Sequence, residues 1–153
     1  MKKEDLELIG VTLYKCEGTK LRKDKRYPNT YVYSIEFTNS DPILLNLYLK
    51  FLIEIIKIDK ERIKIELFVY EDHNKDKLKK FWSDYLKIDL INFQKIIVQK
   101  TKGSKYRPNP LGTCKIRCSG KNDYLRLDEI IKKRLGKNAS LINYKKWRDR
   151  IVV

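Results

Sequence analysis

The sequence contains one histidine and three cysteines, and these small numbers exclude several classes of site. Zinc fingers and other histidine-rich or cysteine-rich nuclease centres need more imidazole and thiolate ligands than this chain has. Cys16, Cys114 and Cys118 form no C-x-x-C pair, and an odd number argues against a closed set of disulfides. His73 stands alone in the charged stretch YEDHNKDK, so there is no base for a hydrolytic triad. Any metal bound here is therefore expected to be a hard cation held by oxygen atoms.

The chain also lacks a long uninterrupted apolar run and a glycine-rich phosphate loop. The longest apolar stretch, around Leu44 to Ile58, is broken by four polar residues, whereas a membrane-spanning helix needs about 20 apolar residues. Neither G-x-x-x-x-G-K nor G-x-G-x-x-G is present, so nothing supports nucleotide-cofactor chemistry. The opening MKKEDLELIG reaches acidic residues at once and has no signal-peptide core. We therefore expect a cytoplasmic protein with reduced thiols and no membrane partner.

Positive charge is what the sequence has in excess. The 153 residues include 35 Lys and Arg against 20 Asp and Glu, which gives a net charge of +15 that is spread along the chain. This length fits one domain, and neither a repeat nor a low-complexity linker divides it. We expect a single domain over residues 1–153, in which 136–153 form a C-terminal helix or a tail. The charge predicts a polyanionic partner, and nucleic acid is the usual one.

The pattern of apolar residues predicts an α+β fold in which helices back an antiparallel sheet. Four helices are predicted, over Glu4–Cys16 with Gly18 as its stop, from Asp41-Pro42 through Ile56, over Lys75–Leu86 with a cap at Asp72 or Asn74, and from an Asn122 cap to Leu135. Strands are predicted over Tyr31–Thr38, Arg62–Tyr70, Phe93–Lys100 and Thr113–Cys118. The last two are expected to form a hairpin through the basic loop TKGSKYRPNPLG, and Cys114 and Cys118 to lie together in the core.

The segment IGVTLYKCEGTK, residues 9–20, is an apolar helix that ends abruptly in Glu-Gly. It resembles the LAGLIDADG motif of homing endonucleases, with Glu17 at the position of the metal-binding acid and Gly18 at the closing glycine. A basic stretch, the strand YVYSIEFTNSDP and a long apolar helix follow in the order that this family uses. The strings LYKCEGTK and FTNSDP are similar to the standalone branch of the family that carries a single motif.

The resemblance implies a saddle-shaped antiparallel sheet and a sequence-specific, Mg²⁺-dependent endonuclease of double-stranded DNA, encoded by a mobile element such as an intron. In the family, two motif helices pack side by side and each delivers one acid to a scissile phosphate. One motif per chain therefore implies a homodimer. The close-packed positions of the helix pair fall on Thr12 and Cys16, and Thr12 departs from the usual glycine. A non-cleaving regulator or an intron-splicing maturase on the same scaffold is the alternative, followed by an RNA-binding module.

Glu17 has an electrostatic reason to bind a cation, since a carboxylate at the C-terminus of a helix meets the negative end of the helix dipole. The resemblance also implies a lysine just beyond the third helix that assists the attacking water. Lys95 is the first candidate and Lys115 the second, and a phosphate contact or a solvated surface position is the alternative for each. One feature departs from the compact family pattern, which has two strands between its second and third helices where this sequence predicts one. The latter half, from about Phe93, is therefore poorly covered by the resemblance.

Two basic clusters and a strand face are the predicted DNA contacts. The clusters are too polar to pack, and strand residues that point away from the helices would line a groove where bases can be read. The predicted contacts are Lys20, Arg22, Lys23, Lys25 and Arg26 before Tyr27, then Lys102, Lys105 and Arg107 around Tyr106, and Lys95, Lys115 and Arg117 on strands.

Overall fold

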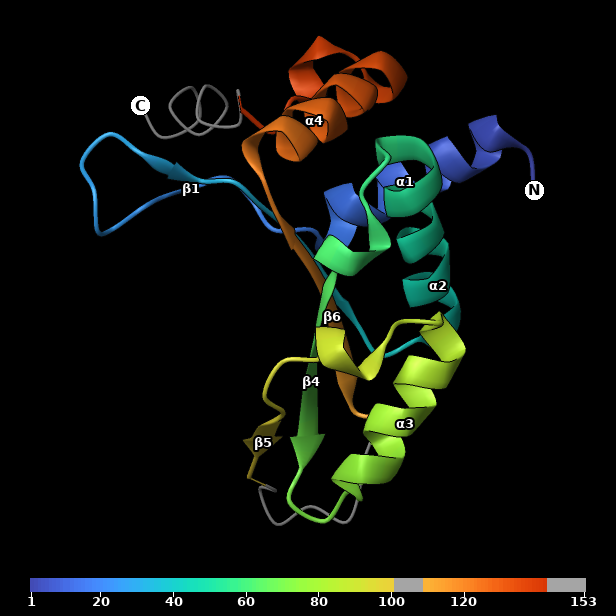
Figure 1. Cartoon of the computed structure of the whole chain (residues 1–153). Helices are drawn as coiled ribbons and strands as arrows, with labels where there is room; N and C mark the ends of the chain where they lie inside the picture. Colours follow the sequence, from blue (N-terminus) through green and yellow to red (C-terminus); the bar gives the residue numbers. More distant parts are fainter. Residues whose placement is uncertain (101–108, 143–153) are drawn as a thin grey trace.

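The computed structural model describes residues 1–100 and 109–142, which form a layer of helices against a mixed sheet (Figure 1). The predicted loop around Lys102, Lys105 and Arg107, and the C-terminal stretch around Trp147, lie outside the described residues. The helices are α1 (Lys3–Glu17), α2 (Pro42–Lys50), the π-helical turn η1 (Phe51–Ile56), α3 (Lys75–Leu86) and α4 (Lys121–Leu135), with short 3-10 turns at η2 (Lys60–Arg62), η3 (Leu90–Asn92) and η4 (Lys137–Ala139). The strands are β1 (Arg22–Lys23), β2 (Tyr31–Val32), β3 (Ser34–Asn39), β4 (Lys64–Tyr70), β5 (Ile97–Gln99) and β6 (Thr113–Ser119).

The main sheet has the strand order β3-β6-β4-β5, so β6, the last strand in the described part of the chain, lies with β4 at its centre. β6 pairs antiparallel with β3 on one side and with β4 on the other. Strand β5 lies at the edge and runs parallel to β4. The α+β class is confirmed, but the sheet is mixed and not wholly antiparallel as predicted.

The predicted hairpin between Phe93–Lys100 and Thr113–Cys118 is wrong. β5 has three residues and contacts β4, because the chain before it is fastened along the start of β4. The buried amide of Asn92 donates to the carbonyl oxygens of Glu61 and Ile63, at 3.0 and 2.8 Å. The backbone N–H of Gln94 then donates to the carbonyl of Ile65 at 2.8 Å. These bonds place the chain before β5 beside the start of β4, so that β5 runs parallel to β4.

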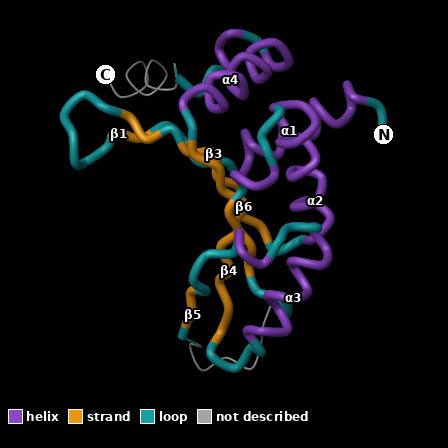
Figure 2. Tube along the Cα trace, viewed as in Figure 1, coloured by secondary structure: helices purple, strands orange, loops and turns teal. Residues whose placement is uncertain are grey.

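The sheet has one buried face and one face without helices. Alternate residues of β4 and β6 point into the core, and they include Ile65, Leu67, Cys114, Ile116 and Cys118. The prediction that Cys114 and Cys118 are buried together is thus confirmed. Helices α2 and α3 lie on the buried side, and the opposite side of β4 and β6 carries no helix among the described residues (Figures 1 and 2). We call this opposite side the open face.

Local signals located most helix ends correctly. The side chain of Asp41 accepts a hydrogen bond from the N–H of Ile43, and Asn74 caps α3, which has the predicted bounds. The Asn122 cap is wrong, since α4 begins at Lys121 after Gly120 and has no side-chain cap. Asp123 in its first turn instead bonds the guanidinium of Arg62 at 2.6 Å.

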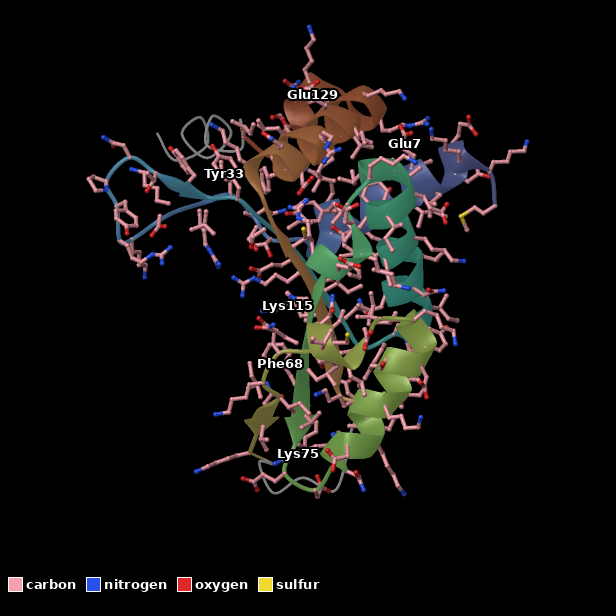
Figure 3. The ribbon with its side chains drawn as sticks, viewed as in Figure 1. Glu7, Tyr33, Phe68, Lys75, Lys115 and Glu129 are labelled. Atoms are coloured by element: carbon pink, nitrogen blue, oxygen red, sulfur yellow. The ribbon has the colours of Figure 1, made fainter. Side chains whose placement is uncertain are left out.

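Close packing fixes the position of α1. Gly10 faces η1, and a Cβ atom there would lie 2.0 Å from Cγ of Phe51. At the same helical level, Glu7 is 6% exposed and accepts hydrogen bonds from Arg134 at 2.7 Å and from Lys133 at 3.3 Å, both on α4. Figure 3 shows Glu7 between these helices. α1 is therefore held by a steric contact on one side and an ionic contact on another.

The glycine contact predicts that Gly10→Ala destabilises the protein by about 1–3 kcal/mol, because the methyl group must displace the Phe51 ring. In an exposed helix the same change stabilises by about 1 kcal/mol. Urea unfolding measures the difference in the free energy of unfolding between Gly10→Ala and wild type. The Phe51→Leu background is the control and should reduce the loss, whereas a Gly10→Ala variant as stable as wild type would contradict the close contact.

The ionic contact predicts a pH-dependent effect of Glu7→Gln. The hydrogen bond from Arg134, followed by the one from Lys133, outweighs burial and holds the pKa of Glu7 below its ordinary value of 4.5. A lowered carboxyl pKa stabilises the fold above the unfolded-state value and loses this effect as the pH falls through the folded-state value. Glu7→Gln should therefore cost about 1–3 kcal/mol at neutral pH, and less as the pH falls below 4.5.

Unfolding measured across this pH range, with exposed Glu54→Gln as the matched control, provides the test. A loss for Glu7→Gln that is the same at all pH values would contradict the ionic contact.

Candidate nucleic-acid interface

The C-terminal end of α1 is tied to the free edge of β3. The N–H of Gly18 bonds the carbonyl of Tyr14 at 2.7 Å, and Gly18 forms an antiparallel bridge with Phe37. Thr19 continues this contact, since its N–H donates to the carbonyl of Glu36 at 3.1 Å. The hydroxyl of the buried Tyr14 donates to the carbonyl of Thr19 at 2.6 Å. These bonds stop the helix at Glu17 and lay the following residues along the sheet.

Glu17 is exposed at this position and has no ion pair or side-chain hydrogen bond within the described part of the chain. A carboxylate at the negative end of a helix is a donor that suits a hard cation such as Mg²⁺. No group of three or more metal-binding side chains gathers anywhere in residues 1–100 and 109–142.

Four charged side chains gather on the open face, and we call them the charge quartet: Glu36 on β3, Glu66 on β4, and Lys115 and Arg117 on β6. Lys115 Nζ lies 3.2 Å from Glu66 and 3.7 Å from Glu36. Arg117 lies 3.2 Å from Glu66 and 3.6 Å from Glu36. Each cation thus contacts both acids, across three adjacent strands.

Lys115 and Arg117 lie where the sequence predicted, on the side of the sheet that faces away from the helices. Lys115 and Phe68 point to this side in Figure 3, and Lys115 Nζ is 5.2 Å from the centroid of the Phe68 ring. The bridge between Gly18 and Phe37 places the end of α1 two strand spacings from β6, which is about 10 Å.

Lys95 is not in a strand, contrary to the prediction. It is exposed in the link between η3 and β5. The hydrogen bonds of Asn92 and Gln94 come before it, and the short edge strand β5 begins only at Ile97. None of its interactions joins it to the charge quartet or to Glu17. Of the two candidate catalytic lysines, the structure therefore brings Lys115 to the centre of the open face and does not bring Lys95 there.

The first basic cluster forms a projecting hairpin, residues 20–32, which we call the arm. β1 and β2 pair antiparallel, and Figure 1 shows the hairpin extending from the body on the side of the open face. Its predicted contacts are exposed: Lys20, Arg22, Lys23, Lys25 and Arg26, against the single acid Asp24. Lys20, Arg22 and Arg26 have partners, since Lys20 donates to the carbonyl of Lys15 at 3.4 Å, Arg22 lies 3.7 Å from Glu36 and Arg26 bonds Asp24 at 2.9 Å. The arm is an exposed cationic surface joined to the charge quartet through Arg22.

Thr12 and Cys16 are exposed on the side of α1 that the described part of the chain leaves uncovered. Leu8, one turn earlier, is 48% exposed, and its carbonyl accepts a hydrogen bond from the Thr12 hydroxyl at 2.8 Å. The opposite side, with Gly10 and Tyr14, is buried within the chain. The helix therefore has a free face at the predicted dimer positions.

The sequence did not single out the two acids of the quartet or the neighbouring hollow. Glu36 and Glu66 stand at polar positions of two alternating strands, and this alternation was the available signal. Beside Arg117 lies a hollow of about 550 Å³ whose charged lining also includes Lys64, Glu61 and Arg62, the last paired with Asp123. The two acids and the hollow could be found only once the neighbouring strands were known. The order of strands in a sheet cannot be read from a local stretch of sequence.

Comparisons with family models, with characterised proteins and with solved structures find no match for this chain. No helix in the described ranges is both long and apolar enough to cross a bilayer. Function must therefore be argued from the site.

The exposed helix face predicts that mild oxidation joins two chains through Cys16 if the α1 helices pack across a twofold axis. Burial raises the pKa values of the Cys114 and Cys118 thiols and protects both, so Cys16 is the reactive cysteine. Non-reducing electrophoresis measures the product, and Cys16→Ser is the control. The sample is tested at a concentration where the protein is dimeric. If the Cys16 thiol is oxidised there and no covalent dimer forms, the interface lies elsewhere.

Proposed function

We propose that this chain is a sequence-specific, Mg²⁺-dependent DNA endonuclease of the LAGLIDADG type that acts as a homodimer. The observation that carries the proposal is the position of Glu17. It is exposed and without a partner in the described residues, at the end of a helix that is fastened to the edge of an open, cationic sheet. The resemblance of IGVTLYKCEGTK to the family motif assigns the metal-binding role to the same residue.

The strand order supports the resemblance in the half of the chain that the motif does not cover. β4 and β6 are adjacent and antiparallel, although residues 71–112 separate them in the sequence. If α3 and β5 are regarded as an insertion between these two strands, the remaining order is helix, strands, helix, two strands and helix. The second strand between helices would then be β6, and the third helix would be α4, which Lys95 and Lys115 precede.

The open face and the arm are the proposed DNA surface. Duplex DNA attracts lysine and arginine through its phosphates, and an exposed arm with five cations offers such contacts. A sheet face that presents Lys115 and Arg117 can approach base edges in the major groove. Lys102, Lys105, Arg107 and Lys95 remain predicted contacts.

Glu17 from each of two chains would hold Mg²⁺ through carboxylate oxygens, since one chain offers a single carboxylate there. When bound, the metal would polarise the scissile phosphate and lower the pKa of an attacking water. The exposed α1 face, with Thr12 and Cys16, would bring the two acids together. Lys115, about two strands away and ion-paired with Glu36 and Glu66, would be the first candidate to stabilise negative charge, and Lys95 the second.

Glu17→Gln is the test of this proposal. The amide keeps the size of the side chain but removes the charge that a divalent cation needs. We expect folding to be retained, metal-free DNA binding to be equal or slightly tighter, and cleavage to fall by about 100-fold or more. The substrate is a duplex made by joining the two sequences that flank the protein's own gene, assayed with Mg²⁺ and with chelator.

Glu4→Gln, an exposed change at the other end of the same helix, is the matched control and should cut normally. A Glu17→Gln variant that cuts as fast as wild type would refute the assignment. If wild type binds the junction tightly but never cuts it, the non-cleaving regulator or splicing maturase is the better function.

A further inference from the structure

We infer that Glu36 and Glu66 determine how strongly the protein discriminates its target from other DNA, by neutralising the centre of the open face and holding Lys115 and Arg117 in place. This inference rests on the proposed DNA-binding function, and it assigns a role to two acids that the proposed cleavage does not use. Acidic side chains at the centre of a face that meets DNA repel phosphates, so their presence there calls for a role that offsets this repulsion.

The two acids are built into the sheet. Glu36 is 8% exposed, and its carboxylate accepts a hydrogen bond from the hydroxyl of Ser34 at 2.8 Å. Glu66 accepts a hydrogen bond from Arg117 at 3.2 Å. Glu36 is directly opposite Arg117 in the strand register, and Glu66 is directly opposite Lys115, so each cation has one direct and one diagonal partner. This doubly bridged arrangement restrains both cations from moving toward a passing phosphate.

The four charges of the quartet sum to zero, in a chain with a net charge of +15, and Arg22 of the arm adds one positive charge at its edge, 3.7 Å from Glu36. A phosphate at the sheet centre would meet two carboxylates as well as two cations, so it gains little there. The hydrogen-bond acceptors on a base edge are neutral, so the two carboxylates repel a base edge less than they repel a phosphate. Arg117 uses Nε and Nη1 toward the acids and keeps Nη2 for a further acceptor, and guanine O6 and N7 are the usual partners of such donors. The quartet therefore favours base contacts over phosphate contacts.

The arm has the opposite character. It carries five exposed cations and one acid, Asp24, within residues 20–32. Affinity without sequence preference is expected to come from the arm, and discrimination from the quartet. Removing the two acidic charges should convert the sheet centre into a second phosphate-binding surface.

The experiment compares Glu36→Gln/Glu66→Gln with the matched control Glu54→Gln/Asp84→Asn, whose acids lie on η1 and α3 in the helix layer. Both variants raise the net charge by the same amount. The probes are a randomised duplex library and the duplex that wild type enriches from it. Affinity for each is measured over a range of salt concentrations, and thermal unfolding verifies the fold.

We expect the quartet variant to bind the randomised library about tenfold or more tightly relative to the control, and the ratio of enriched to random affinity to fall by a similar factor. The slope of log affinity against log salt should steepen by about one to two, because the released cations can each neutralise a phosphate. The single variant Glu66→Gln should show a smaller change of the same sign and serves if the double variant fails to fold.

An affinity ratio and salt slope that change no more than in the control would overturn this inference while leaving the proposed function intact. Absence of DNA binding by wild type would overturn the proposed function, and this inference with it.

Discussion

The antiparallel pairing of β6 with both β3 and β4 is the constraint on which the rest of the structure depends. It places Cys114, Ile116 and Cys118 in the core and, on the alternate positions, Lys115 and Arg117 on the open face. A shift of one residue in this register would exchange the two sets and bury both cations. The same pairing brings Glu36 and Glu66 within reach of these cations from either side. Core and candidate interface are thus two faces of one strand pairing.

The proposed interface divides into parts with different physical tasks. The arm is exposed and strongly cationic, which suits long-range attraction and phosphate contacts. The sheet centre is electrically balanced and restrained, which suits contacts that depend on the shape and hydrogen-bonding pattern of the bases. Glu17 lies at the edge of this surface, on a helix whose other side is fixed by Gly10 and Glu7. In the proposed endonuclease a second chain would contribute the matching acid.

Local features of the fold were predictable from the sequence, and long-range ones were not. The start of α2 at Asp41-Pro42 and the full extent of α3 follow from capping side chains and helical spacing, which act within a few residues. The position of β5 depended on the amide of Asn92, which bonds carbonyls about thirty residues earlier in the chain, and no local pattern indicates this. In the candidate site, Glu17, Lys115 and Arg117 were identified from the sequence. Glu36 and Glu66 were not, because their importance depends on which strands are neighbours.

Photo-crosslinking tests most directly whether the open face is the surface that meets DNA. A benzophenone-bearing amino acid in place of Phe68 lies on the open face beside Lys115, and the same amino acid in place of Ile43, which is 62% exposed on α2, reports on the helix layer. Binding through the open face predicts that irradiation with duplex DNA gives a crosslinked product from position 68 and none from position 43. Crosslinking from position 43 alone would contradict it and would move the DNA surface to the helices.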